Sequence, residues 1–81
     1  MGILRVLSRS GDDQYTWNAA AIEVGDPDAV AAVREAERIF EEQRARGATA
    51  IRITPGRPAE RVDRFDPEAE QIVMVPRVVG G

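Results

Sequence analysis

The sequence predicts a single α+β domain in which a mixed sheet of four to five strands packs on one helix. Three observations lead to this fold class. A segment beginning near Pro27 carries an apolar stripe at helical spacing behind a strong helix start. The segments on either side of it are short and have the β-branched content of strands. Gln71–Val75 is apolar on both faces, which is typical of a central strand.

The residues before the helix predict a hairpin. Ile3–Ser8 forms the first strand, because its apolar side chains include β-branched residues. The turn that follows spans residues 8–13 and contains Gly11. Gln14–Trp17 forms the second strand. We expect residues 18–24 to be the irregular end of this second strand, since their last positions alternate between apolar and charged.

The helix is predicted from both of its ends. Asp26 is a favourable N-cap, Pro27 suits the first helical position, and Asp28 suits the positive end of the helix dipole. The helix is expected to run to about Arg46, with Gly47 as its C-terminal cap. The stripe that should face the sheet consists of Ala29, Val30, Val33, Ala36, Ile39 and Phe40.

Three further strands are expected after the helix. Residues 48–54 form a strand, residues 55–58 a turn, and Glu60–Phe65 a weaker strand at a sheet edge. Residues 66–70 form a turn or a short helical turn, and Gln71–Val75 is the central strand that Pro76 ends. This last strand should lie parallel to the first, because the helix segment is the only connection long enough for a crossover. We expect one domain over residues 1–75 and a flexible tail over residues 76–81.

Composition argues against several classes of function. The chain of 81 residues contains no cysteine and no histidine, which removes thiolate ligands and the commonest general base together. We therefore expect no catalytic residue, no bound metal and no cofactor. The net charge of −3 argues against nucleic acid as a partner. No segment is long and apolar enough for a membrane span, and the start lacks a signal-peptide pattern, so we expect a cytoplasmic protein. We also expect it to be a monomer.

All eleven basic residues are arginine. A GC-rich genome explains this simply, since Ala, Gly, Val and Arg are all frequent. A chemical explanation is also open. Arginine stays protonated and is not an acceptor for acylation, so a chain that carries an activated carboxylate would not acylate its own side chains.

The sequence ends in an apolar tail that carries two glycines, Gly80 and Gly81, after Val75-Pro76-Arg77-Val78-Val79. Neither glycine has a Cβ, so both can pass through a narrow channel, and the carboxylate that follows them is sterically open. These are the requirements of a carboxylate that another enzyme activates. A frayed end that happens to be Gly-Gly is the simpler alternative.

The element order and this tail together resemble the ubiquitin-like β-grasp superfamily, which includes sulfur carriers and small prokaryotic modifiers. The resemblance covers the whole length as an order of elements plus a tail. It is carried by the Leu4–Leu7 strand, the Gly11 turn, the Glu23–Asp28 joint and the Val75–Gly81 tail. The tail has a proline, as sulfur carriers often do, and an arginine close to Gly-Gly, as ubiquitin does. It therefore does not distinguish a modifier from a sulfur carrier.

The resemblance implies that an ATP-dependent adenylating enzyme activates the carboxylate of Gly81. A thiol or sulfur donor then attacks, and the product is a thiocarboxylate or an isopeptide bond to a target protein. Arg77 would contact a carboxylate of the activating enzyme, while Val78 and Val79 would bind its channel as an extended strand. The segment Phe65–Glu70 looks like a family signature to which the resemblance assigns no function.

Three other groups of residues have a functional interpretation and a simpler structural one. The acidic residues Asp63, Asp66, Glu68 and Glu70 could bind a hard cation, but acidic residues at exposed turns are usually solvated and the spacing of a calcium loop is absent. Tyr15 and Trp17 could form a binding platform, although core packing is the stronger interpretation. Arg57 and Arg61 could contact phosphate, with a solvated face as the alternative.

Two functions remain beside the carrier. One is a small non-enzymatic interaction module, such as a phage, defence or regulatory accessory protein, with an incidental Gly-Gly end. The other is a partner protein of toxin–antitoxin type that acts by strand addition at the Glu60–Phe65 edge.

Overall fold

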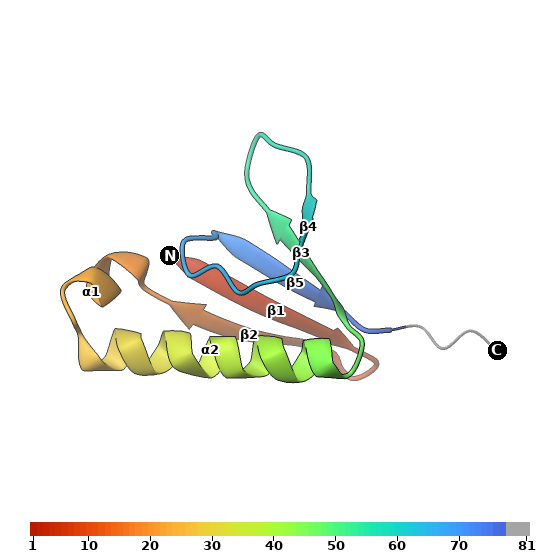
Figure 1. Cartoon of the computed structure of the whole chain (residues 1–81), viewed down its shortest axis with the longest axis horizontal. Coiled ribbons are helices and arrows are strands. Elements are labelled where there is room, and N and C mark those ends of the chain that lie inside the picture. The colour runs from red at the N-terminus through yellow and green to blue at the C-terminus, as the bar shows by residue number, and fades with distance from the viewer. Residues whose placement is uncertain (78–81) are drawn as a thin grey trace.

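The fold is a five-stranded mixed sheet with a long helix packed across one of its faces (Figure 1). The computed structural model describes residues 1–77. In chain order the elements are β1 (Gly2–Ser8), β2 (Gly11–Trp17), α1 (Ala19–Glu23), α2 (Pro27–Ala45), β3 (Thr49–Ile53), β4 (Glu60–Val62) and β5 (Gln71–Val75). The prediction of an α+β fold with four to five strands on one main helix is confirmed.

The first two strands form a tight hairpin. β1 and β2 pair from Gly2 opposite Trp17 to Ser8 opposite Gly11, so only two residues form the loop. The predicted turn was therefore too long, and β2 begins at Gly11 rather than Gln14. A cross-strand contact stabilises the added residues, since Arg5 Nε donates to Asp12 Oδ2 over 3.0 Å.

The prediction for residues 18–24 was wrong, because this segment contains the short helix α1. Asn18 caps it, with its side-chain Oδ1 accepting a hydrogen bond from the N–H of Ala21 over 3.2 Å. Ile22 packs against the core cluster from this helix. Ile22 is half-buried and Val24 is 83% exposed, so the alternation at the end of the segment marks neither a strand nor a buried face.

α2 confirms the predicted helix almost to the residue. The Asp26 side chain accepts a hydrogen bond from the N–H of Asp28 over 2.9 Å, and Pro27 occupies the first turn. The buried positions are Ala29, Ala36, Ile39 and Phe40, all members of the predicted stripe. On the opposite side Arg38 forms ion pairs with Glu35 and Glu42, which keep that side polar.

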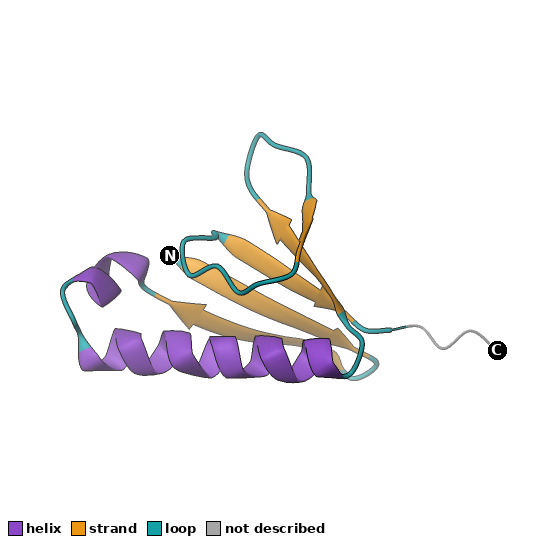
Figure 2. Cartoon of the chain, in the orientation of Figure 1, coloured by secondary structure: helices purple, strands orange, loops and turns teal. Residues whose placement is uncertain are grey.

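The strands, labelled in Figure 1 and orange in Figure 2, lie in the order β2-β1-β5-β3-β4. β5 is central and parallel to β1, as the sequence predicted, and it also pairs antiparallel with β3. α2 is the crossover that this parallel pairing requires. The arrangement is compatible with a β-grasp.

β4 lies at the sheet edge as predicted, but it is shorter than Glu60–Phe65. Pairing ends at Val62, and Phe65 turns inward to join an aromatic cluster. Its ring centroid lies 5.2 Å from that of Trp17 and 5.7 Å from that of Phe40. Burial of this ring favours the departure from the strand, because an aromatic side chain buries a large apolar area.

The core lies between α2 and the facing side of the sheet. Phe40, Leu4, Ile72 and Met74 are its largest fully buried side chains. Trp17 is 2% exposed and Tyr15 packs against the core, so these two aromatics stabilise the fold and do not form an exposed platform. Gly2 allows this packing, because a Cβ at that position would lie 2.1 Å from Cε2 of Trp17.

Candidate functional site

The tail predicted as the functional site begins at the end of the central strand. β5 ends at Val75, and Pro76 follows it without an N–H to continue the ladder. Arg77 is exposed and is the last residue that the structure describes. The other predicted site residues, Val78, Val79, Gly80 and Gly81, lie outside the described residues.

Arg77 is held against the end of α2. A Cβ built on Gly47 would lie 3.1 Å from Cδ and 3.5 Å from Cβ of Arg77, so the aliphatic stem of the arginine lies directly over the glycine. Because Arg77 packs there, the residues that follow β5 leave the sheet at the end where α2 stops (Figure 1).

Gly47 occupies a conformation that keeps this place open. Its φ is +95°, and its N–H donates to the carbonyl of Arg44 over 2.9 Å. The N–H of Ala48 donates to the carbonyl of Gln43 over 3.0 Å, which completes a Schellman-type helix end. Any other residue at position 47 would be strained and would also push on Arg77.

The face of the sheet opposite α2 carries a set of aliphatic side chains, which we call the outer patch. Strand alternation and the registers place its six members on one side: Ile3, Leu7, Ile51, Ile53, Val73 and Val75. Ile53 and Val75 are each 38% exposed, and the other four are half-buried. Strand alternation alone puts Ile51 and Ile53 on one face of β3, but only the pairing with β5 shows that this face is the outer one.

Charged residues lie beside the outer patch. Arg5, between Ile3 and Leu7 on β1, binds Asp12 on the hairpin. The hydrogen bond from the Arg5 guanidinium holds the pKa of the Asp12 carboxyl below its ordinary value, and the charge attraction acts in the same direction. Arg61 lies opposite Ile51 at the other edge of the same face. The patch is thus apolar at its centre and polar at both edges.

The segment Phe65–Glu70 connects distant parts of the fold. Trp17 Nε1 donates to the carbonyl of Pro67 over 2.8 Å, and Arg52 Nη1 donates to Asp66 Oδ2 over 2.9 Å. The N–H of Ile3 donates to the carbonyl of Glu70 over 3.0 Å, which leads into the parallel pairing of β1 and β5. The conformation of this segment is therefore fixed by contacts with residues far away in the sequence.

Two of the four acidic residues weighed as cation ligands bind arginines instead. Asp66 accepts from Arg52, and Asp63 accepts from Arg44 Nη1 over 3.2 Å. Within residues 1–77, no group of three or more potential ligands lies close enough to hold a metal ion. The same residues contain no helix that is long and apolar enough to cross a membrane. No family model, curated protein or solved structure matches this chain.

Proposed function

We propose that the chain is a ubiquitin-like carrier of the β-grasp class and that an ATP-dependent adenylating enzyme activates the carboxylate of Gly81. The observation that carries the proposal is the position of β5. This strand is central and parallel to β1, and it leads through Pro76 and Arg77 directly into the Gly80-Gly81 sequence. A central strand is held on both sides by its neighbours, so it gives the tail a fixed point of departure.

The chemistry requires only the carboxylate from this chain. The Gly81 carboxylate attacks the α-phosphate of ATP, which forms an acyl-adenylate and releases pyrophosphate. A thiol then displaces AMP to give a thioester, or a sulfur donor displaces AMP to give a thiocarboxylate. A lysine amine that attacks the activated carbonyl gives an isopeptide bond. The chain is the substrate in each step, and the catalytic groups belong to the partner enzyme.

Arg77 and the outer patch support the recognition that this function needs. Arg77 would contact a carboxylate of the activating enzyme, and its packing on Gly47 places it at the start of the tail. The outer patch presents aliphatic side chains on a rigid sheet, and Val75, at its edge, immediately precedes the tail. A partner that binds this face would therefore also be close to the residues that it has to activate.

Trapping of the activated carboxylate tests the proposal. The purified chain is incubated with ATP and hydroxylamine in an extract of the organism that encodes it. Hydroxylamine displaces AMP or a thiol from the activated carbonyl and leaves a hydroxamate on Gly81, which the intact mass reveals. We expect this product only with ATP, and none from a chain that lacks Gly81. No ATP-dependent product from the full chain would argue against the carrier function.

The outer patch also supports the second candidate, a small interaction module that needs no activation. The two functions separate with two variants, a chain without Gly80 and Gly81 and an Ile51→Glu chain. A carrier loses activity in cells with the first variant, because the carboxylate is displaced. An interaction module keeps its activity with the first variant and loses it with the second, because it binds its partner through the sheet face alone.

A further inference from the structure

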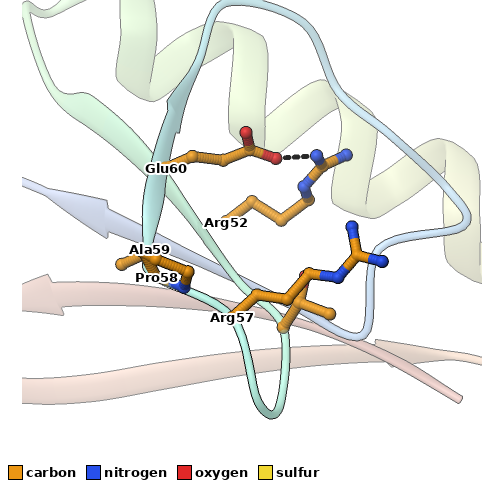
Figure 3. Close-up of a pocket in the computed structure, with 6 residues that line it drawn as sticks. Arg52, Arg57, Pro58, Ala59 and Glu60 are labelled. Carbon is orange, nitrogen blue, oxygen red and sulfur yellow. Dashed lines mark ion pairs between the residues drawn. The ribbon is translucent and has the colours of Figure 1, made fainter.

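The connection between β3 and β4 encloses a hollow that the proposed function does not use. Its volume is about 320 Å³, and it is lined by Arg52, Thr54, Arg57, Pro58, Ala59 and Glu60 (Figure 3). It lies at the end of β3 away from the tail, because Thr49 pairs with Val75 while Ile53 pairs with Gln71. The hollow is thus separate from the place where the tail begins.

A rigid turn builds one wall of this hollow. The N–H of Arg57 donates to the carbonyl of Thr54 over 3.1 Å, and Gly56 has a φ of +77°. Proline at the second position and a positive-φ glycine at the third are the signature of a type II turn. Pro58 has a fixed φ and restricts the backbone dihedrals of the preceding Arg57. The backbone that carries Arg57 is therefore held in one conformation without a ligand.

The two guanidinium groups of the hollow differ in their partners. Arg52 forms ion pairs with Glu60 and with Asp66, and the Glu60 contact joins two residues that line the hollow (Figure 3). Among residues 1–77, Arg57 forms no ion pair and no side-chain hydrogen bond. The lining therefore contains two positive charges against one negative charge, and one of the positive groups is available for a ligand.

The Nε of Arg52 is not a second binding point for a ligand. It has no hydrogen-bond partner among the described residues, although both terminal nitrogens of the same guanidinium are bound. This atom has almost no accessible surface, so a ligand in the hollow would not touch it. Arg52 therefore contributes its charge to the hollow, and Arg57 supplies the N–H donors that a ligand can reach.

We propose that this hollow binds a small oxyanion, a phosphate or carboxylate group, held chiefly by the planar fork of Arg57 with Arg52 beside it. Guanidinium groups bind both anions through paired N–H donors. The volume of about 320 Å³ lies at the lower end of the range for small-molecule sites. Glu60 competes with the anion for Arg52, so the affinity should be modest, with a Kd of about 1–10 mM. The proposal does not depend on the carrier function.

Titration of the isotopically labelled full chain by NMR tests the site. Sodium phosphate and sodium succinate are added in separate titrations at pH 7, with sodium chloride keeping the ionic strength constant. We expect saturable shifts of the backbone amides within residues 52–60. A tighter response to phosphate would identify a phosphate ligand, and a tighter response to succinate a carboxylate ligand; either result supports an oxyanion site.

Three variants decide whether the response comes from the hollow. Arg57→Gln should weaken binding at least tenfold, and Arg57→Lys should give an intermediate loss, because it keeps the charge and removes the fork. Arg64→Gln, which removes an exposed arginine outside the hollow, should change nothing. Shifts that do not saturate, shifts of equal size near Arg9 and Arg64, or an unchanged response in Arg57→Gln would each overturn the proposal.

Discussion

The aliphatic stem of Arg77 lies over Gly47, so the first residues beyond the central strand are fixed to the C-terminal end of α2. The contact joins two segments thirty residues apart in the sequence. It depends on a glycine with a φ of +95°, which leaves room for the arginine. The start of the tail is therefore positioned by the helix end as well as by β5.

Gly47→Ala should destabilise the protein and displace Arg77. The positive φ alone should cost about 1–3 kcal/mol in the free energy of unfolding. The new Cβ would also lie 3.1 Å from Cδ of Arg77, which has to move. Urea denaturation measures the loss of stability, and the chemical shift of the Arg77 amide reports the displacement.

Gly56→Ala is the matched control for this change. Gly56 also has a positive φ, +77°, but a Cβ there would meet no atom within 4 Å. The loss in free energy of unfolding in Gly56→Ala should come from backbone strain alone, and the chemical shift of the Arg77 amide should not change. An equal shift of Arg77 in both variants would contradict the contact.

Trp17→Phe should lower the free energy of unfolding by about 1–3 kcal/mol, because the carbonyl of Pro67 loses the donor that lies 2.8 Å away. Circular dichroism during urea denaturation provides the measurement. Tyr15→Phe is the comparison, since it removes a hydroxyl that has no partner among the described residues, and it should change stability by less than about 0.5 kcal/mol. An equal loss of stability in the two variants would show that the hydrogen bond to Pro67 does not contribute measurably to the free energy of unfolding.

These contacts show which parts of the structure could be predicted from the sequence. α2 was predictable because its signals are local: Asp26, Pro27 and Gly47 lie at its own ends. The central place of β5 followed from its apolar residues and from the single long crossover. The cap at Asn18 was also a local signal, but the alternation at the end of the segment concealed it.

The remaining parts depend on partners distant in the sequence. The local sequence predicts Phe65 to be a strand residue, but its ring packs inward against Trp17 and Phe40. The role of residues 65–70 follows from the bond between Trp17 and Pro67, which are fifty positions apart. At the candidate site, the position of Arg77 near Gly-Gly indicates a role in the tail, but no sequence pattern indicates that it packs on Gly47. The side of the sheet on which the outer patch lies follows only from the strand order, which the sequence does not give completely.

Stability should fall at acid pH in a way that depends on Arg5. The hydrogen bond from Arg5 lowers the pKa of Asp12 in the folded protein below the ordinary value of 3.8. A carboxyl with a lowered folded pKa contributes stability above its unfolded pKa, and this contribution is lost as the pH falls through the folded value. Arg5→Gln should therefore reduce the loss of stability below about pH 4.

Urea midpoints measured from pH 7 to pH 2 check this expectation. Arg9→Gln is the control, because it removes an exposed arginine from the same hairpin that forms no ion pair among residues 1–77. Added salt should weaken the effect, since the Arg5–Asp12 pair is partly exposed. Parallel pH profiles for the wild type and Arg5→Gln would show that this pair does not set the acid sensitivity.

Mass spectrometry of the organism's own proteins shows whether the carboxylate of Gly81 becomes joined to another group. Trypsin cleaves after Arg77, so a target lysine would retain the remnant Val78–Gly81, and a sulfur carrier would instead show one carboxylate oxygen replaced by sulfur in its intact mass. We expect one of these forms to be present and to disappear when the gene is deleted. Abundant chain in the cell with neither the remnant on any lysine nor the thiocarboxylate would contradict the carrier function.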